Sequence, residues 1–441
     1  MKTQILKICR TLLPVLTSLI LILAFPIVLK AAEIPLIDDV IEGRAGIPGI
    51  EDLTSGKVKA GDLVDANNVD LIKDYISPGV YETIKHGLVL RMGTQQPPDQ
   101  IVPKYFREVT EKNRDKAIID ANGTVYYEKE GNLWPGGVPF TRPKNGIEAM
   151  ANTKYGWVYD GAVMYPNTMT YTNAEGKVYK SSLMEQRYLF YNTRTKNPPL
   201  GSIPGYEDIL YKRISVFHAP LELRGLGQYT VRHYDDVKKS DEGFAYFPAY
   251  KRTIRVSATT WQDNIGGSDM TYGDGGGLQE PYSYWEFNLL EKKYILLPEP
   301  KAPFPYVVEK TGEIDKRIKF TVGQKFDISG WAIWPVYVVE GTPTIKHVYG
   351  KKVFYVHAWP YWPSSWQIGL ADSYDRQMKL WKVFWNRRNQ KVIDGDVYTA
   401  VEGGPVYDIQ SRHKTDFWYV EKPYNVKPED FTLQTLIQLG R

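Results

Sequence analysis

The chain of 441 residues carries 55 Lys and Arg against 51 Asp and Glu, which gives a formal net charge of +4, and it has a single cysteine. Four of the basic residues and none of the acidic ones lie in the first 32 positions, so the rest of the chain is close to neutral. This neutrality gives no support for a nucleic-acid partner. The position of Cys9 inside that first segment leaves no thiol for a disulfide framework, a cysteine metal site or a thiol nucleophile.

The first 32 residues have the pattern of a secretory signal peptide. Three basic residues precede an apolar stretch from Thr11 to Leu29, and Ala31 and Ala32 offer small residues for cleavage. The same stretch is about long enough to be a membrane anchor, which needs roughly 17–25 apolar residues. We expect the segment to be cleaved and the protein to be exported to the periplasm, where it could associate with the outer membrane. The alternative is that the segment is kept as a membrane anchor.

Residues 33–122 are expected to form a helical or irregular N-terminal region that packs on a sheet. Asn67–Ile76 has apolar residues at a helical spacing, and Ser77-Pro78 predicts the start of a second helix that continues to Leu88. These are the helices that the pattern predicts before a terminal helix at Pro428–Ile437.

Residues 123–441 are expected to form one large antiparallel β domain that ends in the terminal helix. Short apolar runs are separated by Gly, Pro, Asn and Asp at about hairpin spacing. Many short strands with few helices indicate an all-β fold or a mainly β (α+β) fold. The predicted strands are 157–165, 168–172, 178–191, 208–217, 228–234, 244–256, 282–289, 318–322, 335–340, 344–349, 352–359, 366–370, 377–385 and 397–401.

Aromatic side chains are unusually frequent toward the C-terminal end. The chain has 12 Trp, 32 Tyr and 15 Phe, which is 13% of its residues, and an ordinary core does not need so many large rings. The excess predicts either a very large sheet core or a concave surface that holds something apolar. The residues expected to line such a cavity are Trp331, Trp334, Tyr355, Trp359, Trp362, Trp366, Trp381 and Trp385.

No catalytic residue, cofactor or metal is predicted, and the chain is not expected to be an enzyme. The six histidines make no short pair with ligand spacing. Gly273–Gly277 lacks the Lys and Ser/Thr of a phosphate loop, so it is interpreted, with Asp263–Asp269, as a long turn between strands. Paired carboxylates such as Asp235-Asp236 are better explained by turn chemistry than by glycoside cleavage.

Basic and aromatic residues interleave between positions 376 and 388. Arg376, Lys379, Lys382, Arg387 and Arg388 lie among three large rings. One interpretation is a set of strands with an aromatic inner face and a solvated basic outer face. The other is a pocket with an apolar floor and a cationic rim for the acidic head of an amphiphile.

A series of motifs runs through the second half of the chain. They are Phe247–Ser257, Gly267-Ser-Asp269 with the glycine-rich turn, Glu291–Pro298, Lys351–His357, Trp366-Gln-Ile, Asp372–Asp375 and Leu380-Trp-Lys382. Together they resemble the core of an exported Gram-negative family, domain of unknown function 1329, over most of the mature chain. The insert at Trp359–Ser364 departs from the family's pattern.

The resemblance implies a fold similar to the outer-membrane lipoprotein-sorting carriers, which are large curved antiparallel half-barrels with a few covering helices. It also implies partners, because genes of the family lie beside an inner-membrane permease of the resistance-nodulation-division type and an outer-membrane β-barrel. It supplies no functional residue.

Three functions follow as hypotheses. The first is a periplasmic binding or carrier protein for a lipid or other hydrophobic molecule. The second is a carbohydrate-binding or glycoside-hydrolysing envelope protein, which needs aromatic platforms on an open face. The third is a structural adaptor of a transport assembly, which needs a packed interior and binds no ligand.

Overall fold

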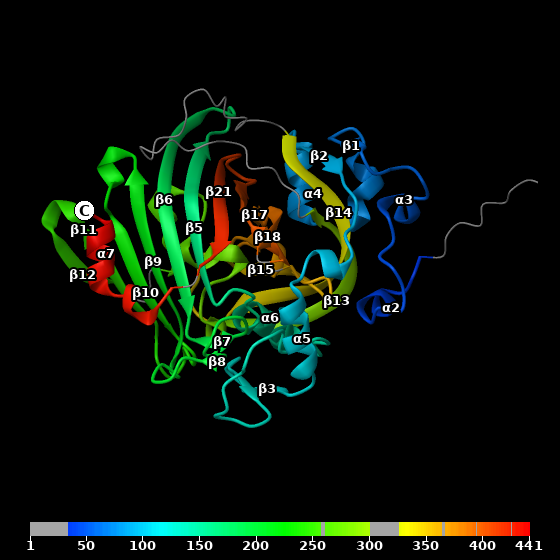
Figure 1. Cartoon of the computed structure of the whole chain (residues 1–441). Helices are drawn as coiled ribbons and strands as arrows, with labels where there is room; N and C mark the ends of the chain where they lie inside the picture. Colours follow the sequence, from blue (N-terminus) through cyan, green and yellow to red (C-terminus); the bar gives the residue numbers. More distant parts are fainter. Residues whose placement is uncertain (1–33, 257–260, 300–325, 364–366, 394, 425) are drawn as a thin grey trace, which may run out of the picture. The chain divides into compact units, whose positions relative to one another are not determined.

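A 15-stranded sheet dominates this computed structural model, which describes residues 34–256, 261–299, 326–363, 367–393, 395–424 and 426–441 (Figure 1). The described helices and strands all lie in the compact unit Pro35–Arg441. The strands of the large sheet are β1 (Leu63–Val64), β2 (Val89–Met92), β5 (Gly161–Thr172), β6 (Val178–Phe190), β9 (Ile209–Ala219), β10 (Gly227–His233), β11 (Glu242–Phe247), β12 (Arg252–Val256), β13 (Trp285–Pro298), β14 (Phe326–Pro343), β15 (Lys351–His357), β16 (Ile368–Tyr374), β17 (Leu380–Trp385), β20 (Gly403–Asp408) and β21 (Lys414–Pro423).

Hydrogen-bonded neighbours in this sheet follow the order β1-β2-β14-β15-β16-β17-β20-β21-β5-β6-β9-β10-β11-β12, and β13 pairs with the other edge of β14. The described pairs are antiparallel except that β2 and β14 run parallel. The prediction of a mainly β fold built on a large, curved and mostly antiparallel sheet is confirmed. Residues 33–122, predicted to pack on the sheet, contribute two of its strands, β1 and β2.

Three two-stranded sheets accompany the large one. They pair β3 (Ala117–Ile119) with β4 (Val125–Tyr127), β7 (Asn192–Arg194) with β8 (Gly201–Ser202), and β18 (Arg388–Ile393) with β19 (Asp396–Val401). The strands of the last pair are antiparallel, and Ile393 is the cross-strand partner of Asp396.

The α-helices of the described residues are α2 (Ile37–Ile41), α3 (Ile50–Leu53), α4 (Pro78–Lys85), α5 (Lys104–Lys112), α6 (Gly146–Tyr155) and α7 (Leu433–Leu439). The predicted helix at Asn67–Ile76 is a 3-10 helix at Val69–Tyr75, and the predicted second helix is α4, whose first turn is capped by the Ser77 side chain.

The prediction of only two helices before the C-terminal one is wrong, because α2, α3, α5 and α6 were missed. The α6 helix starts at the side-chain cap of Asn145 and is buried on most of its surface. Burial on several faces removes the polar stripe by which an amphipathic helix is recognised in a sequence.

The strand predictions are right in position more often than in length. The 157–165 and 168–172 predictions merge into β5, and the 244–256 prediction divides into β11 and β12 around a short 3-10 turn. Residues 344–349 form an irregular loop, so the strand predicted there is wrong, and 318–322 lies outside the described residues. The pattern missed β20 and β21, although β21 joins β20 to β5 in the middle of the sheet.

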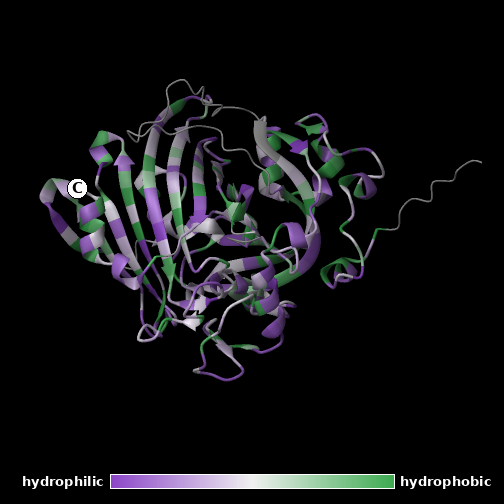
Figure 2. Cartoon of the chain, in the orientation of Figure 1, coloured by the Kyte–Doolittle hydropathy of each residue, from purple (hydrophilic) through white to green (hydrophobic). Residues whose placement is uncertain are grey.

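Side chains alternate between two faces along β6, β9 and β10, as strand geometry requires. On one face, Ile214 and Val216 of β9 pack with Phe431 and with Leu436 of α7 in an apolar cluster. On the other face lie Arg213, Ser215 and Phe217. Figure 2 shows polar and apolar residues interleaved along these strands. The α7 helix therefore covers one face of this part of the sheet and leaves the other for the cavity described next.

Candidate ligand-binding cavity

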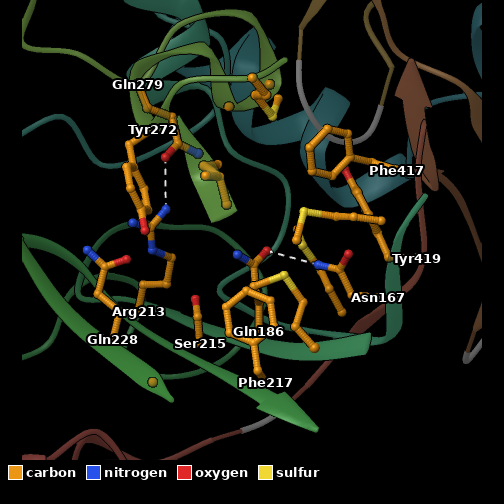
Figure 3. Close-up of a pocket in the computed structure, with 18 of the residues that line it drawn as sticks. Asn167, Gln186, Arg213, Ser215, Phe217, Gln228, Tyr272, Gln279, Phe417 and Tyr419 are labelled. Atoms are coloured by element: carbon orange, nitrogen blue, oxygen red, sulfur yellow. Dashed lines mark hydrogen bonds between the residues drawn. The ribbon is translucent and has the colours of Figure 1, made fainter. Parts of the chain in front are cut away.

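A cavity of about 400 Å³ lies on the face of the sheet opposite α7. Its floor is formed by strands from β17 to β12 that are consecutive in the sheet, and segment Asp263–Gln279 forms a wall (Figure 3). Ligand pockets in proteins commonly measure roughly 300–1,000 Å³. The cavity is therefore large enough for a small molecule.

The register of the strands places one row of side chains across the floor. Consecutive cross-strand partners carry the row from β5 to β12, because neighbours in register point to the same face. The row is Met164, Gln186, Ser215, Gln228, Ala245 and Ile254. Met164 and Ser215 are buried, whereas Ile254 is 51% exposed. The cavity is therefore deepest near β5 and opens toward β12.

Most of the floor and walls are apolar and adaptable. Four of the chain's eight methionines line the cavity, together with four phenylalanines. Methionine side chains are unbranched and polarisable, so they fit ligands of irregular shape. These lining residues are Met164, Met169, Met184, Met270, Phe217, Phe247, Phe384 and Phe417.

A few polar groups interrupt this apolar surface. Asn167 Nδ2 donates a hydrogen bond of 3.3 Å to Gln186 Oε1. Arg213 Nη1 donates one of 2.9 Å to Gln279 Oε1 on the wall (Figure 3). Ser215 Oγ and Asn167 Oδ1 are buried and have no hydrogen-bond partner among the described residues. Such orphaned atoms in a cavity are available to a polar group of a ligand.

The wall is the segment that the sequence analysis interprets as a long turn, and buried charges hold it in place. Asp274 forms a buried ion pair with Lys352 of β15 and accepts a hydrogen bond of 2.7 Å from the Tyr349 hydroxyl. Burial alone would raise the pKa of Asp274, but Lys352 and the nearby Lys382 lower it to about 2. The aspartate is therefore charged and anchors the wall to the sheet.

Glycine is needed where the wall meets the sheet. Gly277 has φ +111°, and a Cβ atom there would lie 2.7 Å from the side chain of Ile368 on β16. Both the backbone conformation and the contact exclude a larger side chain. The glycine-rich sequence therefore allows close packing of the wall against β16.

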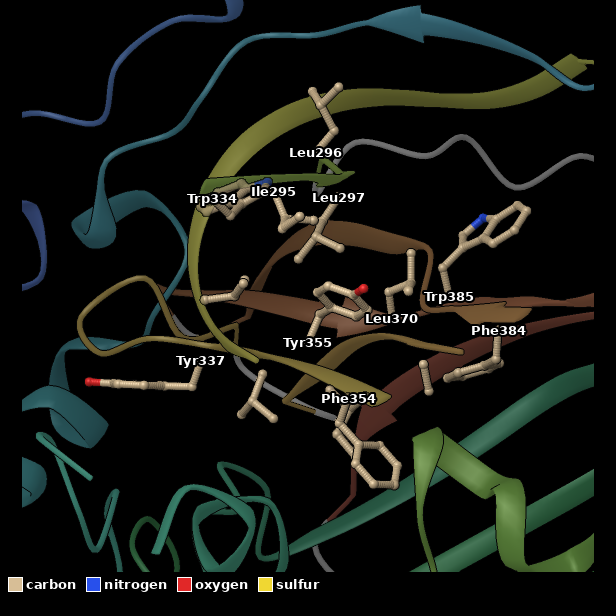
Figure 4. Packing of buried hydrophobic residues seen from close by; sticks show 14 of the residues in the cluster. Ile295, Leu296, Leu297, Trp334, Tyr337, Phe354, Tyr355, Leu370, Phe384 and Trp385 are labelled. Carbon is tan, nitrogen blue, oxygen red and sulfur yellow. The ribbon is translucent and has the colours of Figure 1, made fainter. Parts of the chain in front are cut away.

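The predicted cavity residues belong to the main apolar cluster, which also contains some cavity-lining residues such as Phe384 (Figure 4). Six of them are at most 5% exposed and the half-buried Trp381 packs against the same cluster, while Trp366 lies outside the described residues. The rings of Trp331 and Trp385 meet edge to face with centroids 5.4 Å apart. None of the seven described residues, Trp331, Trp334, Tyr355, Trp359, Trp362, Trp381 and Trp385, lines the cavity. Their binding role stays a prediction.

The basic residues that interleave with these rings contact protein groups. Lys382 Nζ donates a hydrogen bond of 2.6 Å to the Asp269 carbonyl and lies 4.4 Å from the centroid of the Trp381 ring. Arg387 pairs with Asp416 at 2.5 Å and stacks on Trp418. Lys382 is 5% exposed and Arg387 is 4% exposed, so the interpretation of a solvated basic outer face is wrong for both, and neither residue lines the cavity.

Sequence reasoning missed the lining residues because each strand contributes at most three of them. The available signal was the alternation in Met184, Gln186 and Tyr188, and in Arg213, Ser215 and Phe217, where polar and apolar residues share one face. Such a mixed face is unusual for a core and typical of a ligand pocket.

No helix among the described residues is long and apolar enough to cross a membrane. No group of three or more His, Cys, Asp or Glu in that part of the chain has the geometry to hold a metal ion.

The fold and the cavity define a mainly β protein with a mixed apolar and polar pocket inside its sheet. The chain belongs to the family described as Protein of unknown function (DUF1329), whose model matches residues 63–436. The resemblance stated from the motifs is thereby confirmed. No curated protein matches the chain.

Solved structures are similar at low sequence identity. A domain named as an outer membrane lipoprotein-sorting protein, from Vibrio parahaemolyticus, is 18% identical, with a TM-score of 0.44 over 66% of this chain and 98% of that one. A DUF1329 family protein from Desulfovibrio piger is 15% identical, with a TM-score of 0.42 over 63% and 92%. A LolA superfamily protein from Nitrosomonas europaea is 13% identical, with a TM-score of 0.37 over 66% and 100%.

Proposed function

We propose that this protein binds a lipid or another hydrophobic molecule in the cavity and carries it through the periplasm. The cavity of about 400 Å³, lined by methionine and phenylalanine side chains, is the observation that supports this function. Burial of apolar ligand surface drives binding by roughly 25 cal/mol per Å². The signal-peptide pattern of the first 32 residues supports export.

The proposed role is binding and release without catalysis. The opening toward β12, where Ile254 is exposed, gives the ligand a route in and out. An inner-membrane permease and an outer-membrane β-barrel are the proposed partners that would deliver and receive the molecule, and the protein's association with the outer membrane would follow from the second contact.

Native mass spectrometry of protein purified from the periplasm, followed by lipid extraction, tests the proposal. We expect a fraction of the protein to carry a bound amphiphile or other apolar molecule that organic solvent releases. Delipidated protein should then bind the neutral dye N-phenyl-1-naphthylamine with an increase in fluorescence.

Protein with no bound apolar molecule that also fails to bind the dye would contradict the proposal and favour a structural adaptor. Release of an oligosaccharide in place of a lipid would favour a carbohydrate-binding protein.

A further inference from the structure

Two neighbouring arginines, Arg213 on β9 and Arg232 on β10, are both almost fully buried and both contact Gln279 on the cavity wall. Arg213 is 6% exposed and Arg232 is 4% exposed. Arg213 donates to the Gln279 side chain at 2.9 Å, and Arg232 donates to the Gln279 carbonyl at 2.5 Å. The two residues differ in what balances their charge.

The charge of Arg232 is neutralised within the fold. Its guanidinium forms a forked pair with Asp241, in which Nη2 lies 2.7 Å from Oδ2 and Nε lies 3.3 Å from Oδ1 and 3.0 Å from Oδ2. A carboxylate that accepts two parallel N–H bonds is the ordinary partner of a buried arginine.

Arg213 has no such partner among the described residues. Its hydrogen bonds go to the neutral groups of Gln279 and, at 3.5 Å, Thr230, and its Nε is buried without an acceptor. Burial would lower the pKa of Arg213, but the nearby Tyr188 and Tyr211 hold it above the ordinary value, so the side chain stays charged. A buried cation without a counter-ion is costly, which makes the site attractive to an anion.

The other charged side chain that lines the cavity, Asp263, does not neutralise the charge of Arg213. Asp263 lies on the wall, is exposed, and forms no ion pair with Arg213 in the described part of the chain. Water therefore solvates its charge, whereas the charge of Arg213 is shielded from water.

The arginine lies at one end of an apolar surface. Along β9 the cavity face presents Arg213, then Ser215 with its orphaned hydroxyl, then Phe217. Arg213 and Phe217 are four residues apart along the strand, which corresponds to about 13 Å. Phe217 is the cross-strand partner of Met184, so the surface beyond Ser215 is apolar. A cation, then a hydroxyl group and then an apolar surface follow one another along the strand. This order is complementary to an amphiphile that has an anionic head group followed by a hydrocarbon chain.

Resting on the proposed function, we infer that the ligand of this cavity is an amphiphile with a single anionic head group, which Arg213 binds with help from the Ser215 hydroxyl, while its chain lies on the methionines and phenylalanines. Carboxylate, sulfonate and phosphate heads share the chemistry that this site recognises. Neutral and cationic amphiphiles of the same chain length bind more weakly because they leave Arg213 unpaired.

Three probes with the same chain separate the head group from the chain: hexadecanoate, hexadecanol and hexadecyltrimethylammonium. Each displaces N-phenyl-1-naphthylamine from the delipidated protein at pH 8. We expect hexadecanoate to bind the wild type at least about 10-fold more tightly than hexadecanol, with the cationic probe weakest, because a carboxylate forms charge-assisted hydrogen bonds with the guanidinium of Arg213.

The variant Arg213→Gln should lose the preference for hexadecanoate and keep the affinity for hexadecanol, and Arg213→Lys should keep part of the preference. Lys212→Gln is the matched control, because it removes a positive charge at the next position of the same strand, where the ammonium lies 4.9 Å from the Tyr191 ring and outside the cavity lining. It should keep the full preference.

Equal binding of hexadecanoate and hexadecanol to the wild type, or equal loss of both in Arg213→Gln, would overturn the inference and leave the proposed function standing. Failure of all three probes to bind would overturn both. Where Arg213→Gln does not fold, as judged by thermal unfolding, the wild-type preference and Arg213→Lys decide the question.

Discussion

The Ser77 hydroxyl donates a hydrogen bond of 2.9 Å to the buried carboxylate of Asp372, 295 residues further along the chain. The Gly79 backbone N–H donates a second one of 3.2 Å to the same carboxylate. Ser77 also caps α4, and Asp372 lies on β16, so these contacts join the N-terminal helical region to the sheet. Burial raises the pKa of Asp372 to about 7, although both hydrogen bonds lower it.

This pKa predicts a dependence of stability on pH. Between pH 4 and pH 7 the folded state holds a proton on Asp372 that the unfolded state has lost, so the free energy of unfolding falls as pH rises through that range and levels off above pH 7. The slope is at most about 1.4 kcal/mol per pH unit. Urea unfolding of wild type and Asp372→Asn measures it, and we expect the variant to lack this part of the slope.

Asp375→Asn is the control, because Asp375 lies in the turn after β16, where it accepts backbone hydrogen bonds from Gln377 and Lys379. It should keep the wild-type slope. Parallel curves for Asp372→Asn and wild type would show that Asp372 is ionised in the folded protein at pH 5.

The ion pair between Lys352 and Asp274 predicts a large loss of stability when one partner is removed. Lys352→Met leaves the buried carboxylate of Asp274 unpaired and should lower the free energy of unfolding by about 3–5 kcal/mol. Lys351→Met breaks the more exposed pair with Glu340 and should change it by less than about 1 kcal/mol. Chemical denaturation measures both variants, and losses of equal size would show that the buried pair does not hold the wall.

Filling the cavity should abolish binding and leave the fold intact. Ser215→Phe places a ring in the middle of the floor, where the side chain has no partner to lose. We expect at least about a 10-fold loss of affinity for N-phenyl-1-naphthylamine, because apolar contact area is no longer available to the dye. Ser181→Phe makes the same change on β6 at a residue that does not line the cavity, and it should bind normally. Equal affinity in the two variants would place the dye elsewhere.

The tryptophan cluster, which is the part of the main apolar cluster around Trp331 and Trp385, should contribute more to stability than to binding. Trp331 is fully buried against Trp385, so Trp331→Ala should lower the free energy of unfolding by about 3–5 kcal/mol and change dye affinity less than about 2-fold. Thermal unfolding and dye titration measure the two effects. A loss of affinity without a loss of stability would mean that the tryptophans line the binding site, as the sequence predicts.

How far the sequence predicts the fold depends on periodicity. β10 alternates Tyr229 and Val231 with polar residues and was found close to its bounds. In contrast, β21 lies within the sheet and α6 is buried on several faces, so neither of these two elements shows a period that separates core from solvent. Motifs in Phe247–Ser257 and Gly267–Asp269 were sufficient to indicate the family.

The position of the cavity depends on packing, which composition does not report. The count of aromatic residues points to the region with the most rings, but rings such as Trp331 and Tyr355 fill the space between strands with one another. The cavity lies where smaller and polar residues such as Ser215 and Gln186 share the floor with methionine. Only the register between distant strands brings those residues together.

The measurement that tests the cavity most directly is a titration of protein carrying ¹³C-methyl methionine with hexadecanol, followed by NMR. Met164, Met169, Met184 and Met270 line the cavity, whereas Met92 is paired with Trp331 in the tryptophan cluster. We predict that ligand shifts the methyl signals of the four cavity methionines and leaves that of Met92 unchanged. Shifts at Met92 with none at the four would contradict this account and place the ligand among the tryptophans.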